Sequence, residues 1–152
     1  MRALIQRVKE ASVDVSKVLH SKIETGLLIF LGITHADTPD AARYLAQRCA
    51  HLRIFEDQQG KMNLSVRDVG GKALVVSQFT LYADTRRGNR PGFTDAAAPE
   101  VAERLYEDFV RCLRNEIGES NVATGVFRSK MDVRLINDGP VTIMLESKNQ
   151  FE

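Results

Sequence analysis

The chain has no tryptophan, only two cysteines and four prolines, and no long run of apolar residues. Cys49 and Cys112 do not form a CxxC pair, and the N-terminal apolar stretch is too short for a signal peptide. We therefore expect free thiols in the reducing cytoplasm. The longest apolar run, residues 26–33, is far shorter than the roughly 20 residues that a membrane-spanning helix needs. These absences argue against a disulfide scaffold and a membrane partner.

An excess of either charge is also absent, because 21 basic residues face 20 acidic ones. The net charge of +1 excludes a strongly basic clamp for nucleic acids, although a local basic patch remains compatible with it. A length of 152 residues predicts one domain over residues 1–152. A chain of this size buries enough surface to fold without a metal or a disulfide.

Common catalytic signatures are missing too: there is no GxxxxGK[ST], GxGxxG, HExxH or GxSxG motif. The three histidines, His20, His35 and His51, have no metal-ligand spacing, so we expect neither a metal nor another cofactor. His35 lies beside Asp37 after an apolar run and is the one candidate base. A solvated turn histidine is the commoner role for such a residue.

What the sequence does contain favours an α+β fold. Two apolar runs, residues 27–33 and 73–76, predict central strands. Capping residues predict one helix from Thr38 to about His51 and another from Pro99 to Gly118. Further strands are predicted by alternating or β-branched residues at positions 2–8, 11–15, 52–56, 131–135 and 141–146.

The sequence Asn137-Asp138-Gly139-Pro140 predicts a corner between two strands of a hairpin. Asp-Gly favours a tight turn, but the proline that follows removes a backbone donor and restricts the residue before it. A strained or cis peptide at this corner is expected, and such features gather at functional sites.

Polar residues close the second central strand, in the segment Ser77-Gln78-Phe79-Thr80. Strand alternation would place Ser77 and Phe79 on one face and Gln78 and Thr80 on the other. Their hydroxyl and amide groups either line a substrate pocket or tie the strand end to the next loop, and the residues alone favour neither interpretation.

The loop that follows, residues 84–98, contains Arg86, Arg87 and Arg90 together with Phe93. Arginines and an aromatic ring on a glycine-bearing loop suit contacts to phosphates and stacking on bases. A solvated charged loop is the commoner explanation for such a composition. The prediction of an RNA-binding loop gains weight because the loop leaves directly from the polar strand end.

Three segments resemble the bacterial type of D-aminoacyl-tRNA deacylase: GKMNLSV at 60–66, SQFTLYAD at 77–84 and NDGPVT at 137–142. Gln6-Arg7-Val8 and the RPGF sequence at 90–93 also fit. The resemblance runs from Met1 to about Ser147. It implies a homodimer with a mixed, largely antiparallel, barrel-like sheet and two covering helices.

The resemblance implies hydrolysis of the ester that joins a D-amino acid, or mischarged glycine, to the terminal adenosine of tRNA. Ser77, Gln78, Phe79 and Thr80 would form the catalytic pocket, with the 2′-hydroxyl of tRNA assisting water and backbone amides near Phe79 and Thr80 holding the oxyanion. Gly139 and Pro140, joined by a cis peptide, would reach into the partner's pocket and exclude L-side chains. Supporting positions fall to Arg7, Met131 and Asn137, and tRNA contacts to Arg86, Arg87 and Arg90. No cofactor and no DNA partner are implied.

The sequence departs from the family at Arg128-Ser129-Lys130, where small residues are expected. This adds two positive charges near the tRNA entrance that the resemblance implies. Three alternatives stay open: an editing domain like those of some archaeal threonyl-tRNA synthetases, which normally belongs to a longer chain; a non-catalytic RNA-binding module using the Arg86–Arg90 loop; and an esterase that uses Ser77 or Thr80 with His35.

Overall fold

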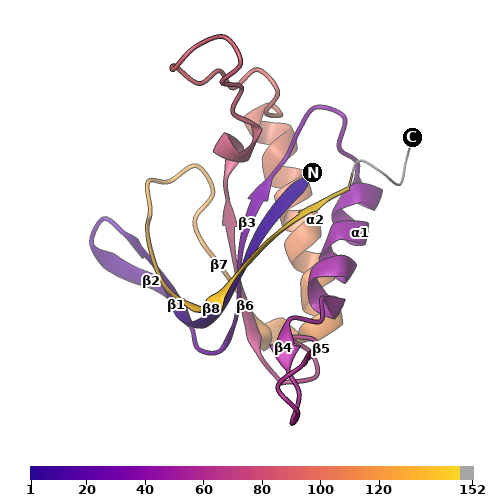
Figure 1. Cartoon of the computed structure of the whole chain (residues 1–152). Coiled ribbons are helices and arrows are strands. Elements are labelled where there is room, and N and C mark those ends of the chain that lie inside the picture. Colours follow the sequence, from indigo (N-terminus) through magenta and orange to yellow (C-terminus); the bar gives the residue numbers. More distant parts are fainter. Residues whose placement is uncertain (148–152) are drawn as a thin grey trace.

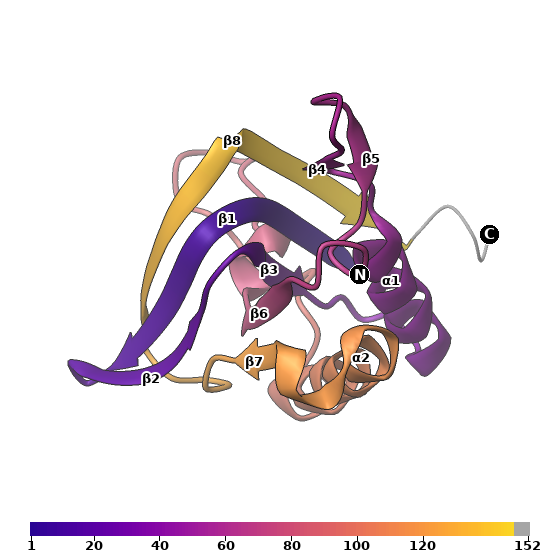
Figure 2. The ribbon, with the colours of Figure 1, turned by 90° about the horizontal axis from the view of Figure 1, so that it is seen from below.

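The computed structural model describes residues 1–147. A curved sheet forms the centre, with two helices on one side of it (Figure 1). The strands are β1 (Arg2–Val15), β2 (Val18–Ile23), β3 (Gly26–Gly32), β6 (Lys72–Ser77), β7 (Val122–Thr124) and β8 (Asp132–Glu146). Their order is β2-β1-β3-β6-β7, and β8 pairs with β1 along the other side. The sheet is nearly closed, and the expected mixed α+β fold with a barrel-like sheet is confirmed (Figure 2).

The two apolar runs form adjacent parallel strands, β3 and β6, in the middle of the sheet. Both are buried on both faces, as their composition predicts. Side chains on the helix side, such as Ile29 and Val75, join one core with α1 and α2. Those on the other side, such as Leu28 and Leu74, join a smaller core inside the curl of the sheet.

Both helices begin and end close to the predicted residues. Helix α1 (Pro39–His51) starts after Thr38, whose hydroxyl accepts a hydrogen bond from the amide of Ala41 at 3.2 Å. Helix α2 (Pro99–Ile117) ends at Gly118, which has a φ of 105° that favours glycine. The helices pack against the sheet and each other, which leaves the opposite sheet face without a helix (Figure 2).

The hairpin predicted around Gly139 is wrong. Strand β8 runs through the whole segment and pairs antiparallel with β1 on both sides of it. Gln6 lies opposite Thr142 and Val8 lies opposite Asn137, so four residues of β8 stand against Arg7 alone. The Asp-Gly-Pro sequence therefore makes a bulge within one strand, because both flanks find the same neighbour. Likewise, the predicted strands at 2–8 and 11–15 are one continuous strand.

Two smaller differences concern β2 and the segment after α1. Strand β2 was not expected, because half of its sequence VLHSKI is polar and its residues do not alternate; most of them are exposed. The strand predicted over 52–56 shrinks to β4 (Phe55–Glu56), which pairs with β5 (Met62–Leu64) in a separate two-stranded sheet. Two short 3₁₀ helices, η1 (Phe79–Tyr82) and η2 (Glu119–Asn121), complete the elements. Within residues 1–147, no helix is both long and apolar enough to cross a membrane.

Candidate active site

A cavity of about 820 Å³ lies beyond the ends of β3 and β6. This volume falls in the range of small-molecule sites. Its walls come from four parts of the chain: the end of β6 with η1, the loop after β3, the start of α2 with the loop before it, and the segment between β7 and β8. The predicted residues Ser77, Gln78, Phe79 and Met131 are among those that line it.

The segment from Ser77 to Thr80 does not continue as a strand, which corrects the predicted alternation. The Gln78 amide donates to the carbonyl of Leu31 at 2.8 Å, and the chain then turns into η1. This turn brings the Gln78 side-chain amide onto the Thr80 hydroxyl, to which it donates. The amides of Phe79 and Thr80 stand in the first turn of η1 and donate to no acceptor within residues 1–147.

Two exposed aromatic rings stand together at the cavity. Phe79 and Phe93 pack edge to face, with ring centroids 5.1 Å apart, although their side chains are 58% and 38% exposed. Both residues line the cavity. Large apolar side chains that remain this exposed commonly mark a binding surface. A planar ring of a ligand can stack here.

The arginine loop is closed at its base by a pair of backbone hydrogen bonds between Asp84 and Gly92, of 2.8 and 2.9 Å. The Asp84 carboxylate also accepts from the Arg86 guanidinium at 2.8 and 2.9 Å, which lowers the pKa of Asp84 to about 2. Arg86 is therefore partly occupied within the loop. Arg87 and Arg90 are exposed and make no hydrogen bond or ion pair within residues 1–147.

His35 lines the cavity, but its ring is already engaged. Its Nε2 lies 2.6 Å from the carbonyl of Thr94 and must donate, because a carbonyl oxygen can only accept. The neighbouring Asp37 does not orient it. That carboxylate accepts instead from the Met1 ammonium group and from the amide of Thr34, the latter at 2.7 Å. Nε2 therefore cannot take a proton from Ser77 or Thr80 in this arrangement.

A second group of predicted residues gathers at the bulge of β8. Arg7 is 6% exposed, and it donates from Nη1 to the carbonyl of Ile54 at 2.7 Å and from Nε to the carbonyl of Asp138 at 3.1 Å. The Asn137 side chain accepts from the Val141 amide at 3.1 Å and donates to the Thr142 hydroxyl at 3.1 Å. These contacts hold the backbone of the bulge in one arrangement.

Gly139 and Pro140 form the exposed tip of this bulge and are joined by a cis peptide. Gly139 has a φ of 133°, and a Cβ atom there would lie 2.8 Å from the Val141 side chain. Only glycine fits this backbone and this space.

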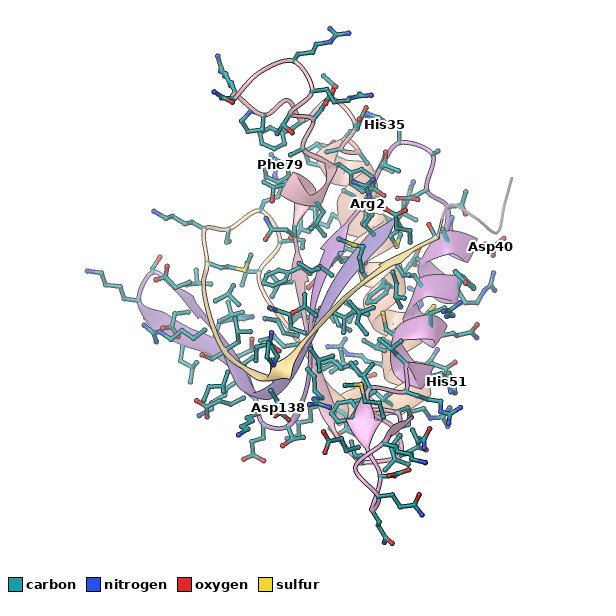
Figure 3. All side chains as sticks on the ribbon, viewed as in Figure 1. Arg2, His35, Asp40, His51, Phe79 and Asp138 are labelled. Atoms are coloured by element: carbon teal, nitrogen blue, oxygen red, sulfur yellow. The ribbon has the colours of Figure 1, made fainter. Side chains whose placement is uncertain are left out.

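The bulge and the cavity lie at opposite ends of the sheet in one chain. Figure 3 shows Asp138, next to Gly139, far from Phe79 and His35. Accordingly, Arg7, Asn137, Gly139 and Pro140 do not line the cavity. The structure thus divides the predicted residues into two groups that a single chain does not bring together.

Several cavity-lining residues were not predicted as site residues, among them Ile33, Ala97, Ala102 and Phe127. Small and apolar residues of this kind carry no chemical signal in a sequence. Arg128 and Lys130 also line the cavity, and the sequence marked them only as departures from the family. Within residues 1–147, no cluster of three histidine, cysteine or acidic side chains is arranged to hold a metal ion.

The chain is similar to known proteins over nearly its whole length. The family model described as D-Tyr-tRNA(Tyr) deacylase matches residues 4–146. A D-aminoacyl-tRNA deacylase of Chlorobaculum tepidum is 55% identical over 147 residues, which are 97% of each chain. One of Chloroflexus aurantiacus is 57% identical over 147 residues, covering 97% of this chain and 91% of that protein.

Two solved structures share the fold. One, titled c-Myc DNA Unwinding Element Binding Protein, superimposes with a TM-score of 0.92 at 40% identity, covering 96% of this chain and 98% of that one. The other, titled a probable eukaryotic D-amino acid tRNA deacylase, has a TM-score of 0.81 at 19% identity over 95% and 98%, and shows the fold alone. With a family match over nearly the whole length and relatives above 50% identity, the chain belongs to the D-aminoacyl-tRNA deacylases, which are hydrolases.

Proposed function

We propose that this protein, as one domain over residues 1–152 in the cytoplasm, removes D-amino acids and glycine from tRNA as a proofreading step of translation. The reaction is hydrolysis of the ester between the amino acid and the terminal adenosine. The observation that carries the proposal is the cavity beside η1, where unbonded amides and exposed aromatic rings meet in a chain of this family.

The terminal adenosine is held by the rim of the cavity. Its base stacks on the Phe79–Phe93 pair, whose rings are exposed and already fixed against each other. Arg87 and Arg90 face the phosphates of the tRNA end, because their guanidinium groups have no partner in the described part of the chain. Arg86 contributes less, since Asp84 holds it.

The chemistry uses the backbone of η1 rather than a side-chain base. Water attacks the ester carbonyl carbon with help from the 2′-hydroxyl of the tRNA, and the bond from that carbon to the 3′-oxygen then breaks. The amides of Phe79 and Thr80 stabilise the tetrahedral oxyanion, since they have no acceptor of their own. His35 is not the base, because its Nε2 donates to Thr94. Thr80 is not the nucleophile, because no base is arranged to activate it.

Selection against L-amino acids comes from a second copy of the chain. Gly139 and Pro140 are exposed and firmly held, yet they lie far from the cavity of their own chain. In a homodimer, this bulge enters the partner's cavity and its carbonyl groups fill the space that an L-side chain needs. Glycine and D-residues avoid that clash, so the device rejects one hand rather than recognising the other.

An apolar row on the sheet face without helices supports the dimer. Phe30, Leu4 and Met144 lie side by side on β3, β1 and β8 in the strand register. Met144 is 44% exposed, and neither helix covers this face. A second copy that covers this row would remove apolar surface from water.

The test is a deacylation time course on D-Tyr-tRNA and L-Tyr-tRNA in parallel, at sub-micromolar enzyme with EDTA. Loss of the D-ester alone supports the proposal, including the absence of a metal cofactor. Loss of both esters indicates a general esterase and overturns the role of Gly139 and Pro140.

A second candidate is nucleic-acid binding without turnover, favoured by the exposed Arg87 and Arg90 and by the DNA-binding title of one similar structure. Persistence of both esters, with tRNA or DNA binding that weakens steeply with salt, would support this candidate.

A further inference from the structure

The segment between β7 and β8 carries two cations at the cavity, Arg128 and Lys130. Both side chains are exposed, and neither makes a hydrogen bond or an ion pair within residues 1–147. Arg86, by contrast, is bound to Asp84. Two free cations on a cavity wall leave positive charge available to a ligand.

The backbone at Arg128 shows that its side chain is not incidental. The Ser129 amide donates to the carbonyl of Val126 at 3.2 Å, so residues 126–129 form a turn with Arg128 at its third position. Arg128 has a φ of 64° there, in the left-handed region where turns of this kind favour glycine. An arginine is less stable than glycine at this point, and such exceptions are commonest where a side chain has a function.

Arg128 differs from the other non-glycine residues that have a positive φ. Ser16 and Lys17 also have positive φ values, of 51° and 65°. They are the two residues between β1 and β2, and two-residue hairpin turns of type I′ require positive φ at both positions. The hairpin explains Lys17, whereas no hairpin explains Arg128. Lys17 also does not line the cavity.

The turn at residues 126–129 is held in place by contacts with Met131 and with α2. The Val126 amide donates to the Met131 sulfur at 3.4 Å, and a Cβ atom on Gly125 would lie 2.7 Å from that sulfur. Phe127 packs against Tyr106 of α2, with ring centroids 5.7 Å apart. Arg128 and Lys130 therefore extend from an anchored support, so less conformational freedom is lost when they bind.

We propose that Arg128 and Lys130 bind the phosphate on the 5′ side of the terminal adenosine, and that this contact rests on the proposed deacylase function. A guanidinium binds two phosphate oxygens at once, and an ammonium adds a point charge. The acid nearest in the sequence, Asp132, forms no ion pair within residues 1–147 that would neutralise these cations. The contact positions the ester without taking part in the chemistry.

The experiment compares two minimal substrates that differ by one phosphate, 3′-O-D-tyrosyl-adenosine and 3′-O-D-tyrosyl-AMP. For the native chain, the phosphate should raise kcat/KM about tenfold, as expected from two partly exposed charge contacts. In the double variant Arg128→Gly, Lys130→Ala the two substrates should become equal, with kcat/KM for the phosphate-free ester unchanged. Glycine suits the turn at position 128, so the backbone should stay intact.

The matched control is Lys17→Gly, which removes one positive charge and one left-handed residue outside the cavity. It should leave the phosphate effect in place. With whole D-Tyr-tRNA, the slope of log(kcat/KM) against log salt should be shallower by about 0.7 in the double variant, because one phosphate contact is lost.

A native chain that treats both small esters alike would overturn the proposal. So would a double variant that loses the same factor on both esters, because the residues would then act through the cavity wall. If the native chain hydrolyses neither ester, the deacylase function itself fails. Dissociation constants of AMP and adenosine, measured by calorimetry on the same three proteins, then decide whether the two cations bind phosphate.

Discussion

The two ends of the sheet are built in different ways. At the cavity end, exposed side chains stand on η1 and on the loop that follows it: Phe79 and Phe93 pack on each other, and Arg87 and Arg90 extend from the closed loop. At the bulge end, the exposed surface is backbone, held from inside by the buried Arg7. Side chains can adapt to any base or amino acid, whereas a braced backbone can reject a shape.

Under the proposed function, this difference would give the two tasks of a proofreading enzyme to separate regions. Binding must tolerate many tRNAs, so it suits stacking and charge. Rejection of one chirality requires a group that cannot move out of the way, so it suits a rigid backbone such as that of the bulge. One chain keeps these regions apart. The proposed division of tasks can therefore be tested by separating the two chains of the dimer, by weakening the contacts that hold the bulge, or by changing a residue beside the cavity.

Separating the chains should have the largest effect. Met144→Asp places a carboxylate in the apolar row, and its burial between two chains is strongly unfavourable. We expect a monomer by light scattering and a fall of about 100-fold in the preference for D-Tyr-tRNA over L-Tyr-tRNA, the scale on which steric selection operates.

The matched control is Ile136→Asp, on the same strand. Ile136 is 50% exposed and lies opposite Glu10, on the other face of the sheet from Met144. This variant should remain a dimer with normal selectivity. A monomeric Met144→Asp protein that still rejects the L-ester would disprove the role of the second chain.

Removing the hydrogen bonds by which Arg7 holds the bulge of β8 should have the next largest effect. Arg7→Met keeps the bulk of the side chain but removes the donors to the carbonyls of Ile54 and Asp138. Leaving buried acceptors unsatisfied should lower the free energy of unfolding by about 2–4 kcal/mol, measured by urea denaturation. The preference for the D-ester should fall about tenfold while the dimer persists.

Arg48→Met serves as the comparison, because Arg48 is exposed and, within residues 1–147, donates only to the hydroxyl of Tyr44 on its own helix. It should change neither stability nor selectivity by more than about 0.5 kcal/mol. Equal behaviour of the two variants would mean that Arg7 does not brace the bulge.

The sequence indicates the regular parts of this fold well, because they depend on local patterns. Thr38-Pro39 and Gly118 mark helix ends, and the apolar runs mark β3 and β6. The bulge was mistaken for a hairpin because Asp-Gly-Pro describes a local kink and not the neighbour of each flank. That neighbour, β1, lies about 130 residues away in the chain, as the contact of Arg7 with Asp138 across 131 positions shows.

The cavity was only partly predictable for a similar reason. Ser77, Gln78 and Phe79 line it, and polar residues after an apolar run are a visible pattern, whereas Met131 was expected only from the family resemblance. Ala97 and Ala102 also line the cavity, but only because the fold places them there, since an alanine gives no chemical signal in a sequence. The 3₁₀ turn of η1 depends on the Gln78 amide finding the Leu31 carbonyl on β3, and strand alternation cannot foresee that contact.

A change at Thr80 should have a smaller effect, because Thr80 stands in η1 beside the cavity and does not line it. Its hydroxyl accepts from the Gln78 side chain and is exposed, so Thr80→Ala removes one surface hydrogen bond. If the tRNA 2′-hydroxyl assists the reaction, kcat should fall less than about tenfold, since a neutral hydrogen bond contributes about 1 kcal/mol. Single-turnover deacylation of D-Tyr-tRNA measures this, and complete loss would restore Thr80 as a nucleophile.

The smallest effect should come from the ion pair between Asp84 and Arg86 at the base of the arginine loop. The hydrogen bonds from Arg86 hold the pKa of Asp84 at about 2, below the ordinary value of 3.8. Because the pKa of Asp84 is lowered, the Asp84–Arg86 ion pair contributes its full stabilisation above roughly pH 4 and loses it as the pH falls toward 2. In Arg86→Ala, the Asp84 carboxyl should titrate closer to 3.8, as followed by ¹³C NMR. An unchanged titration would show that Arg86 does not stabilise the Asp84 carboxylate, and would add its guanidinium to those of Arg87 and Arg90 in the proposed contact with tRNA.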